Sequence, residues 1–98
     1  MQYKDKEEKQ LVINFNLERA DITWQEANSL SQNDEFWHGC ANRLYYAAFY
    51  AVTALLIKND HYSKTHAGVR NLFNQHFVQI DIVQKATGRF YTKLFDTR

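Results

Sequence analysis

The sequence contains no proline and only three glycines, so it has few of the residues that shape turns and end helices. Its one cysteine, Cys40, excludes an intrachain disulfide and a cysteine-rich zinc site, and we expect it to be a buried thiol. The longest mostly apolar stretch, residues 44–57, is shorter than the about 20 residues of a membrane-spanning helix. These absences favour an all-α protein that does not enter a membrane.

The two ends of the chain also lack signals. Residues 1–10 carry mixed charge and no apolar core of a signal peptide, which predicts a cytoplasmic protein with a charged, frayed N-terminus. The last residues contain no helix-ending signal, so we expect a domain truncated at its C-terminus. With 98 residues, 45% of them hydrophobic and 23% charged, residues 1–98 are expected to form a single domain.

Charge is divided unevenly along the chain. Residues 1–49 hold five Lys or Arg against eight Asp or Glu, a net charge of −3. Residues 50–98 hold seven against three, a net charge of +4. The basic half favours a phosphate-bearing or acidic partner. The alternative is that the two halves attract each other within the fold or across a dimer.

Apolar residues spaced by three and four predict four helices, over about residues 13–30, 35–58, 65–76 and 83–94. The second helix is apolar on two faces, so it has to be covered on more than one side, in a bundle or at an oligomer interface. We expect Asn33 or Asp34 to cap the second helix and Ser63 or Thr65 to cap the third. The apolar stripe that predicts the first helix consists of Ile13, Leu17, Ala20, Trp24, Ala27 and Leu30. The helix itself can extend beyond this stripe toward the N-terminus, as far as Glu7. The fourth helix is outlined by Val83, Ala86 or Thr87, Phe90 and Leu94.

No phosphate loop, paired-histidine metal motif or serine-hydrolase elbow is present, so we expect neither a metal nor a cofactor. The strongest chemical pairing is Arg70 with His76. Metal-free RNA cleavage needs a group that exchanges protons near neutral pH and a fixed cation beside the charged phosphorane. Six helical steps leave the two side chains about 120° apart, so their convergence requires a two-fold related partner or a broken helix end. The alternative is a solvated Arg70 and a His76 half-buried at a helix end.

Arg43 lies between the two apolar faces of the second helix, so its charge requires a partner. One interpretation is a structural ion pair with an acidic residue of the first helix, namely Glu18, Asp21 or Glu26. The other is a phosphate or nucleotide site in which Tyr46 stacks on a base. In that interpretation the start of the third helix, Thr65 and His66, also binds the phosphate.

Three segments carry a family likeness when they are taken together. They are residues 41–51 (ANRLYYAAFYA), residues 54–56 (ALL) and residues 64–70 (KTHAGVR), followed by Phe73, Phe77 and Val78. The chain resembles the HEPN-domain family, and most of all its small stand-alone bacterial and archaeal branch. The resemblance covers about residues 11–98 and implies an antiparallel up-and-down helical bundle that commonly dimerises and that lacks its final helix here.

The resemblance implies a toxin-type, nucleotide-binding or RNA-binding partner of a small nucleotidyltransferase antitoxin. Active members are metal-independent endoribonucleases, whose signature is arginine, a polar residue and, a few positions later, histidine. Arg70, Asn71 and His76 match that string, earlier in the chain than the family site usually lies. In the branch that this chain resembles, the late helix more often reads arginine followed by Asp-Tyr, and Arg98 would be that arginine. Because some members are scaffolds, the alternative is a non-catalytic helical dimerisation or interaction module.

Overall fold

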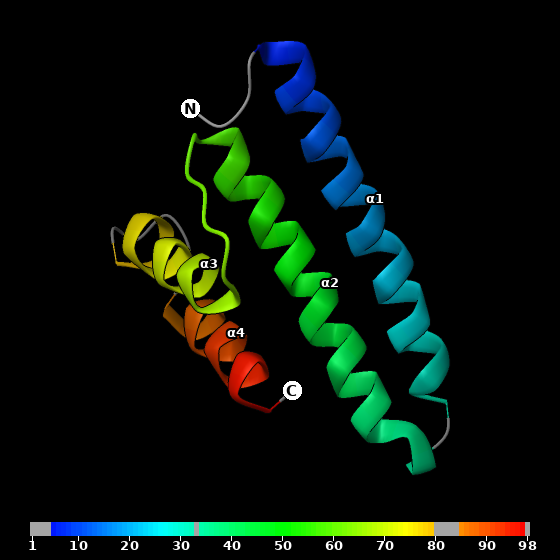
Figure 1. Cartoon of the computed structure of the whole chain (residues 1–98). Helices are drawn as coiled ribbons and strands as arrows, with labels where there is room; N and C mark the ends of the chain where they lie inside the picture. The colour runs from blue at the N-terminus through cyan, green and yellow to red at the C-terminus, as the bar shows by residue number, and fades with distance from the viewer. Residues whose placement is uncertain (1–4, 33, 80–84, 98) are drawn as a thin grey trace.

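The computed structural model describes residues 5–32, 34–79 and 85–97, which form helices joined by short connections (Figure 1). The described residues form four α-helices: α1 spans Lys6–Leu30, α2 Trp37–Lys58, α3 His66–Phe73 and α4 Lys85–Thr97. A 3-10 turn, η1 (Asp34–Phe36), precedes α2, and a π-helical turn, η2 (Asn74–Val78), continues α3. The prediction of an all-α chain with about four helices is confirmed.

The helix α2 is the central element. It runs antiparallel to α1 on one side, while α3 and α4 pack against it on the other and η2 packs against α3 and α4 (Figure 1). The connection after α2 returns alongside that helix, so α3 begins level with the middle of α2, where His66 stacks on Phe49. The central position agrees with the two apolar faces that its sequence shows.

The core has two parts, one on each side of α2. Toward α3 and α4, the largest cluster of buried side chains surrounds the fully buried Tyr45 and includes Leu56, Phe73 and Tyr91. Toward α1, Ile13 packs with Ala54 and Ile57. Burying large apolar side chains contributes about 1.5–3 kcal/mol each, so the cluster around Tyr45 is the main source of stability.

The predicted stripe of α1 is only partly the face that is buried. Ile13 and Ala27 are buried as expected, but Leu17 and Trp24 are 51% and 55% exposed. The seam with α2 instead buries two polar residues, Asn16 and Thr23. Both side chains hydrogen-bond to carbonyls one turn earlier in α1, which satisfies their polar groups without a partner helix. The apolar residues beside them remain on an uncovered face.

The helix α2 has the length and mean hydropathy, 1.2 over 18 residues, that crossing a membrane would require. The same window is 28% buried within the chain, so helices cover this segment only in part. Arg43 lies in the first third of α2 and faces Glu26 of α1 across the helix seam. In the described fold α2 is therefore the central helix of a bundle with one side left open.

The helix ends agree with the sequence at some positions and differ at others. α1 begins at Lys6 with Asp5 as its cap, so residues 6–10, expected to be frayed, are helical. Thr65 caps α3 as predicted. The cap of α2 is Phe36, which makes no side-chain cap hydrogen bond, because η1 intervenes and Asp34 lies within it. Some expected positions lie outside the described residues or side chains: Asn33, Val83, Ala86, Phe90 and Leu94.

Candidate functional site

The first site residue, His66, lies in an aromatic pocket of α2. Its ring stacks on Phe49 with a centroid distance of 4.2 Å and meets the edge of Tyr46 at 5.8 Å. Its Nδ1 atom lies 2.7 Å from the hydroxyl oxygen of Tyr45, within hydrogen-bonding distance. Thr65 positions this histidine, because its side chain accepts a hydrogen bond from the backbone of Gly68 and so fixes the start of α3. Thr65 and His66 thus both have structural contacts, and phosphate binding by them stays a prediction.

Arg43 has the structural partner that one interpretation required. Its guanidinium lies 3.8 Å from the Glu26 carboxylate of α1 and donates to the side-chain oxygen of Asn42 at 2.6 Å. The guanidinium also lies over the ring of Tyr46, 5.3 Å from its centroid. Three of the four residues predicted to bind a nucleotide therefore form a contiguous line from Arg43 through Tyr46 to His66.

Arg70 and His76 lie in different surroundings. The guanidinium of Arg70 lies 4.5 Å above the ring of Phe95 in α4 and within 3.4 Å of the Asn71 side chain. No contact joins Arg70 to His76 among the residues that the structure describes. The pair stays a prediction within one chain, and Arg98 lies outside the described residues.

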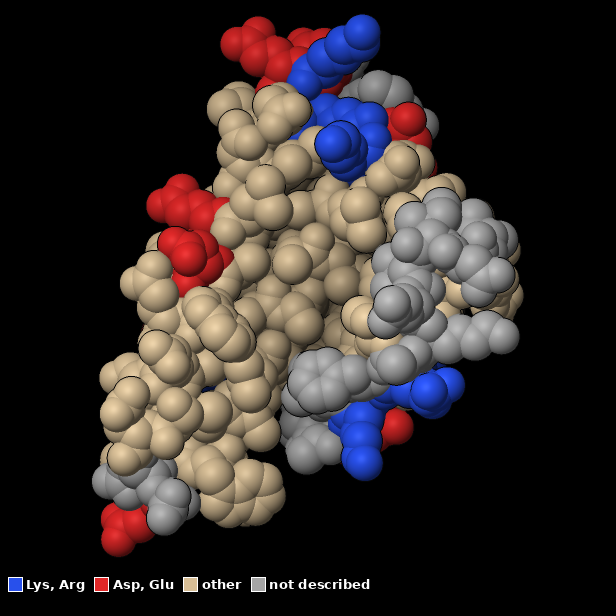
Figure 2. Space-filling model, turned by 180° about the vertical axis from the view of Figure 1, so that it is seen from behind, with Lys and Arg blue, Asp and Glu red and all other residues tan. Residues whose placement is uncertain are grey.

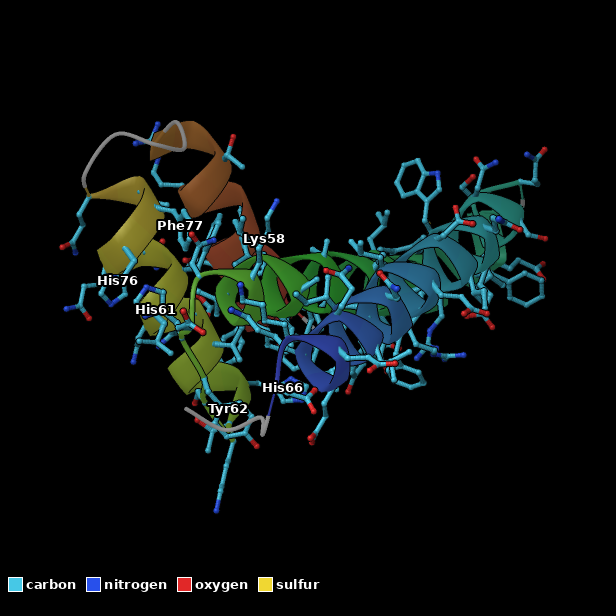
Figure 3. The ribbon with its side chains drawn as sticks, turned by 90° about the horizontal axis from the view of Figure 1, so that it is seen from above. Lys58, His61, Tyr62, His66, His76 and Phe77 are labelled. Carbon is cyan, nitrogen blue, oxygen red and sulfur yellow. The ribbon has the colours of Figure 1, made fainter. Side chains whose placement is uncertain are left out.

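His76 has a partner that the sequence did not indicate. The imidazole rings of His61 and His76 stack with centroids 3.8 Å apart and planes 17° apart, beside Phe77 (Figure 3). Both side chains are half-buried. The nitrogens of an imidazole can accept or donate a proton, so two adjacent imidazoles offer a proton acceptor and a proton donor at the same place. We call His61 and His76 the histidine pair.

The end of α2 places His61 in this pair. The N–H of His61 donates to the carbonyl of Leu56 at 2.8 Å, and the N–H of Asp60 donates to Ile57 at 3.0 Å. These are the two hydrogen bonds of a Schellman motif, in which the residue before His61 takes a left-handed conformation. Asp60 has that conformation, with φ of 64°, although glycine is usual there.

Asp60 is also held from α1. The Lys9 ammonium lies 2.7 Å from the Asp60 carboxylate. The hydrogen bond from Lys9, and then its charge, lower the pKa of Asp60 below the usual value. This contact joins the start of α1 to the turn that carries His61.

The described residues contain no group of three or more His, Cys, Asp or Glu side chains that could hold a metal ion. Cys40 is half-buried, and its Sγ atom lies 3.3 Å from the carbonyl oxygen of Ala27. The thiol therefore packs in the seam between α1 and α2 rather than beside the histidine pair.

Together these observations define a small all-α domain, built on a central aromatic helix, with histidines on either side of its third helix. The chain belongs to the HEPN-domain family, whose sequence profile matches residues 13–98. The resemblance noted in the sequence is thereby confirmed.

Curated relatives come from a bacterium and an archaeon. The chain is 37% identical over 91 residues to the UPF0332 protein of Thermotoga maritima, an alignment that covers 93% of this chain and 68% of that protein. It is 32% identical over 82 residues to a Methanocaldococcus jannaschii protein named "Putative toxin MJ0605", covering 84% of this chain and 60% of that protein. A second protein of that archaeon, named "Putative toxin MJ0142", is 33% identical over 63 residues, covering 64% of this chain and 42% of that protein. No solved structure matches the chain.

Proposed function

We propose that this chain is a toxin-type HEPN domain that cleaves RNA without a metal ion. The observation that carries the proposal is the histidine pair, in which His61 and His76 stack with centroids 3.8 Å apart. Membership of the family and the names of the two archaeal relatives support the same reading.

The proposed reaction uses the two imidazoles as base and acid. One neutral imidazole takes the proton of the ribose 2′-hydroxyl while the 2′-oxygen forms a bond to phosphorus. The bond from phosphorus to the 5′-oxygen breaks, and the other imidazole, protonated at the start, gives its proton to that oxygen. The products are a 2′,3′-cyclic phosphate and a 5′-hydroxyl, and proton transfer of this kind contributes about 10²–10⁴ to a rate. A cation beside the phosphorane would stabilise its charge, and Arg70 remains the predicted residue for that role.

An RNA cleavage assay tests the proposal. The 98-residue chain is incubated with cellular RNA, with and without EDTA, beside His61→Ala, His76→Ala and Arg70→Ala. We expect cleavage that EDTA does not reduce and that falls about 10²–10⁴-fold in either histidine variant. His38→Ala is the matched control, because His38 is exposed and stacks on Trp37 at the other end of α2.

Two results would contradict the proposal. Absence of cleavage by the unaltered chain removes the ribonuclease function. Equal cleavage by the His76→Ala and His38→Ala variants removes the histidine pair as its site.

We propose further that the chain dimerises through the uncovered side of α1 and α2. A groove of about 410 Å³ between these helices is lined by Ala20, Trp24, Leu44, Ala47, Ala48 and Ala51, with Asp21 at its edge. Figure 2 shows a broad uncharged area over both helices, hollowed in the middle, with charged residues at its rim. Light scattering on the wild type and Trp24→Glu tests this: we expect a dimer for the first and a monomer for the second.

The same uncovered face supports a second function, a non-catalytic interaction module. A chain that dimerises but leaves RNA intact would favour this alternative.

The toxin proposal also includes a nucleotidyltransferase antitoxin as partner and action in the cytoplasm. Co-expression of the chain with the nucleotidyltransferase encoded beside it, if one is present, tests that part: the chain alone should arrest growth, and the partner should restore it.

A further inference from the structure

An open groove of about 580 Å³ lies where α4 crosses η2, on the side of the bundle away from α1. Two buried residues, Val78 and Gly88, line it and are called its floor here, and Asn74 and Gln79 line it as well. This groove, which we call the η2–α4 groove, is separate from the hollow between α1 and α2.

Two local features create the η2–α4 groove. The first is the π-helical turn, in which the N–H of Gln79 donates to the carbonyl of Asn74, five residues earlier, at 2.8 Å. The second is Gly88, since a Cβ atom there would lie 2.8 Å from a methyl group of Val78. The missing side chain lets α4 approach η2 closely. π-Helical turns occur frequently at functional sites, so the turn favours a binding role for this seam.

The outer wall of the η2–α4 groove is basic. Arg89 and Lys93 are exposed, line the groove and lie one helical turn apart on the same face of α4. Asp96 is the single carboxylate among the described lining residues. Arg70 adds a third cation at the end of this seam, one turn before Asn74, where its guanidinium lies against α4. Lys and Arg atoms gather at the α4 side of the molecule in Figure 2.

We propose that the η2–α4 groove binds the backbone of a single-stranded RNA, an inference that rests on the proposed ribonuclease function. Arg89 and Lys93 pair with phosphates, which supply most of the affinity in such complexes. Asn74, Gln79 and the Thr92 hydroxyl offer hydrogen bonds to sugar and base edges, while the apolar floor accepts base faces.

The position of the groove relative to the histidine pair supports this assignment. Asn74 and Val78, at the two ends of the π-helical turn, line the groove, and His76 lies between them in sequence. The His76 ring faces His61 instead of the groove. An RNA strand held in the groove therefore lies beside the turn that carries His76, one member of the histidine pair.

Binding to a 2′-O-methyl RNA oligonucleotide tests the inference, because that modification blocks the proposed cleavage and leaves the phosphates unchanged. Fluorescence anisotropy compares the wild type with Arg89→Glu/Lys93→Glu over a range of salt concentrations. Lys6→Glu/Lys64→Glu is the matched control, since it changes the net charge equally at exposed positions outside the groove. If circular dichroism shows that the groove variant is unfolded, the milder Arg89→Ala/Lys93→Ala variant replaces it in the comparison.

We expect the groove variant to bind at least about tenfold more weakly than the control. The slope of the logarithm of the binding constant against the logarithm of the salt concentration should become shallower by about 1.4. Each phosphate contact to a single strand contributes about 0.7 to that slope, and the variant loses two contacts. Equal weakening in the groove variant and the control overturns the groove assignment while the ribonuclease proposal stands. Competition by polyglutamate as strong as that by unlabelled RNA overturns the choice of RNA as the ligand. A wild type that binds no RNA at all contradicts the ribonuclease proposal itself.

Discussion

Substituting alanine for Gly88 separates helix propensity from packing in the seam between α4 and η2. In a helix interior alanine is favoured over glycine by about 0.8–1 kcal/mol, so propensity alone predicts a more stable protein. The added Cβ would lie 2.8 and 2.9 Å from the two methyl groups of Val78 and 3.1 Å from the side-chain oxygen of Asn74. Rotation of the valine about χ1 exchanges one methyl group for the other and gives little relief. Overpacking of this kind costs about 1–3 kcal/mol.

Gly88→Ala should therefore destabilise the chain by about 1 kcal/mol, which lowers its melting temperature by roughly 4–8 °C. Gly39→Ala is the matched control, because the added Cβ would meet only Leu30 at 3.5 Å, an ordinary contact. That variant should gain about 0.5–1 kcal/mol. Thermal and urea denaturation followed by circular dichroism measures both values.

A double-mutant cycle identifies the contact responsible. Combining Gly88→Ala with Val78→Ala should cost less than the sum of the two single changes, with a coupling of about 1 kcal/mol or more. The reasoning is refuted if Gly88→Ala stabilises the chain as much as Gly39→Ala does and the cycle shows no coupling.

Substitutions at three further positions test other contacts. The lowered pKa of Asp60 implies that Lys9 stabilises the folded state above the unfolded pKa of about 3.9, and that this contribution is lost as pH falls through the folded pKa. Asp60→Asn should therefore remove part of the pH dependence of the melting temperature below about pH 4. Thr65→Ala should cost about 1 kcal/mol through loss of the helix cap, and Thr65→Ser should restore most of it, as urea denaturation would measure. Tyr45→Phe should cost about 0.5–1.5 kcal/mol in the same assay, because it removes the hydroxyl that contacts His66, and a neutral result would contradict that role.

Local sequence signals predicted the parts of the fold that depend on local chemistry. The spacing of apolar residues indicated all four helices, and Thr65, one of the two candidates for the third cap, is the residue found. An ion pair with Glu18, Asp21 or Glu26 of the first helix was one of the two interpretations of Arg43, and Glu26 is the partner found. The helices and the cap needed only neighbours along one helix, and the Arg43 pairing needed only the charge of the adjacent helix.

The inward face of α1 could not be assigned from periodicity. Leu17 and Trp24 have the spacing of a buried stripe, yet the neighbouring stripe with Asn16 and Thr23 faces α2. Polar residues can occupy that seam because they bond to carbonyls of their own helix. Periodicity identifies apolar positions but does not say which of them this chain covers by itself.

The histidine pair was missed for a different reason. His61 and His76 lie fifteen positions apart in sequence, and neither has a metal-ligand spacing or a motif that links it to the other. Their meeting depends on how far the connection after α2 returns and on a π-helical turn that α-helical spacing does not predict.

The geometry of the histidine pair thus follows from two helix ends rather than from the core. The Schellman turn directs the chain back after Asp60, and His61 is the first residue to follow it. His76 is the central residue of the five-residue π-helical turn. The next residue in that turn, Phe77, is buried. Both supports are backbone hydrogen bonds, and Phe77, which contacts His61, joins the pair to the core cluster around Tyr45.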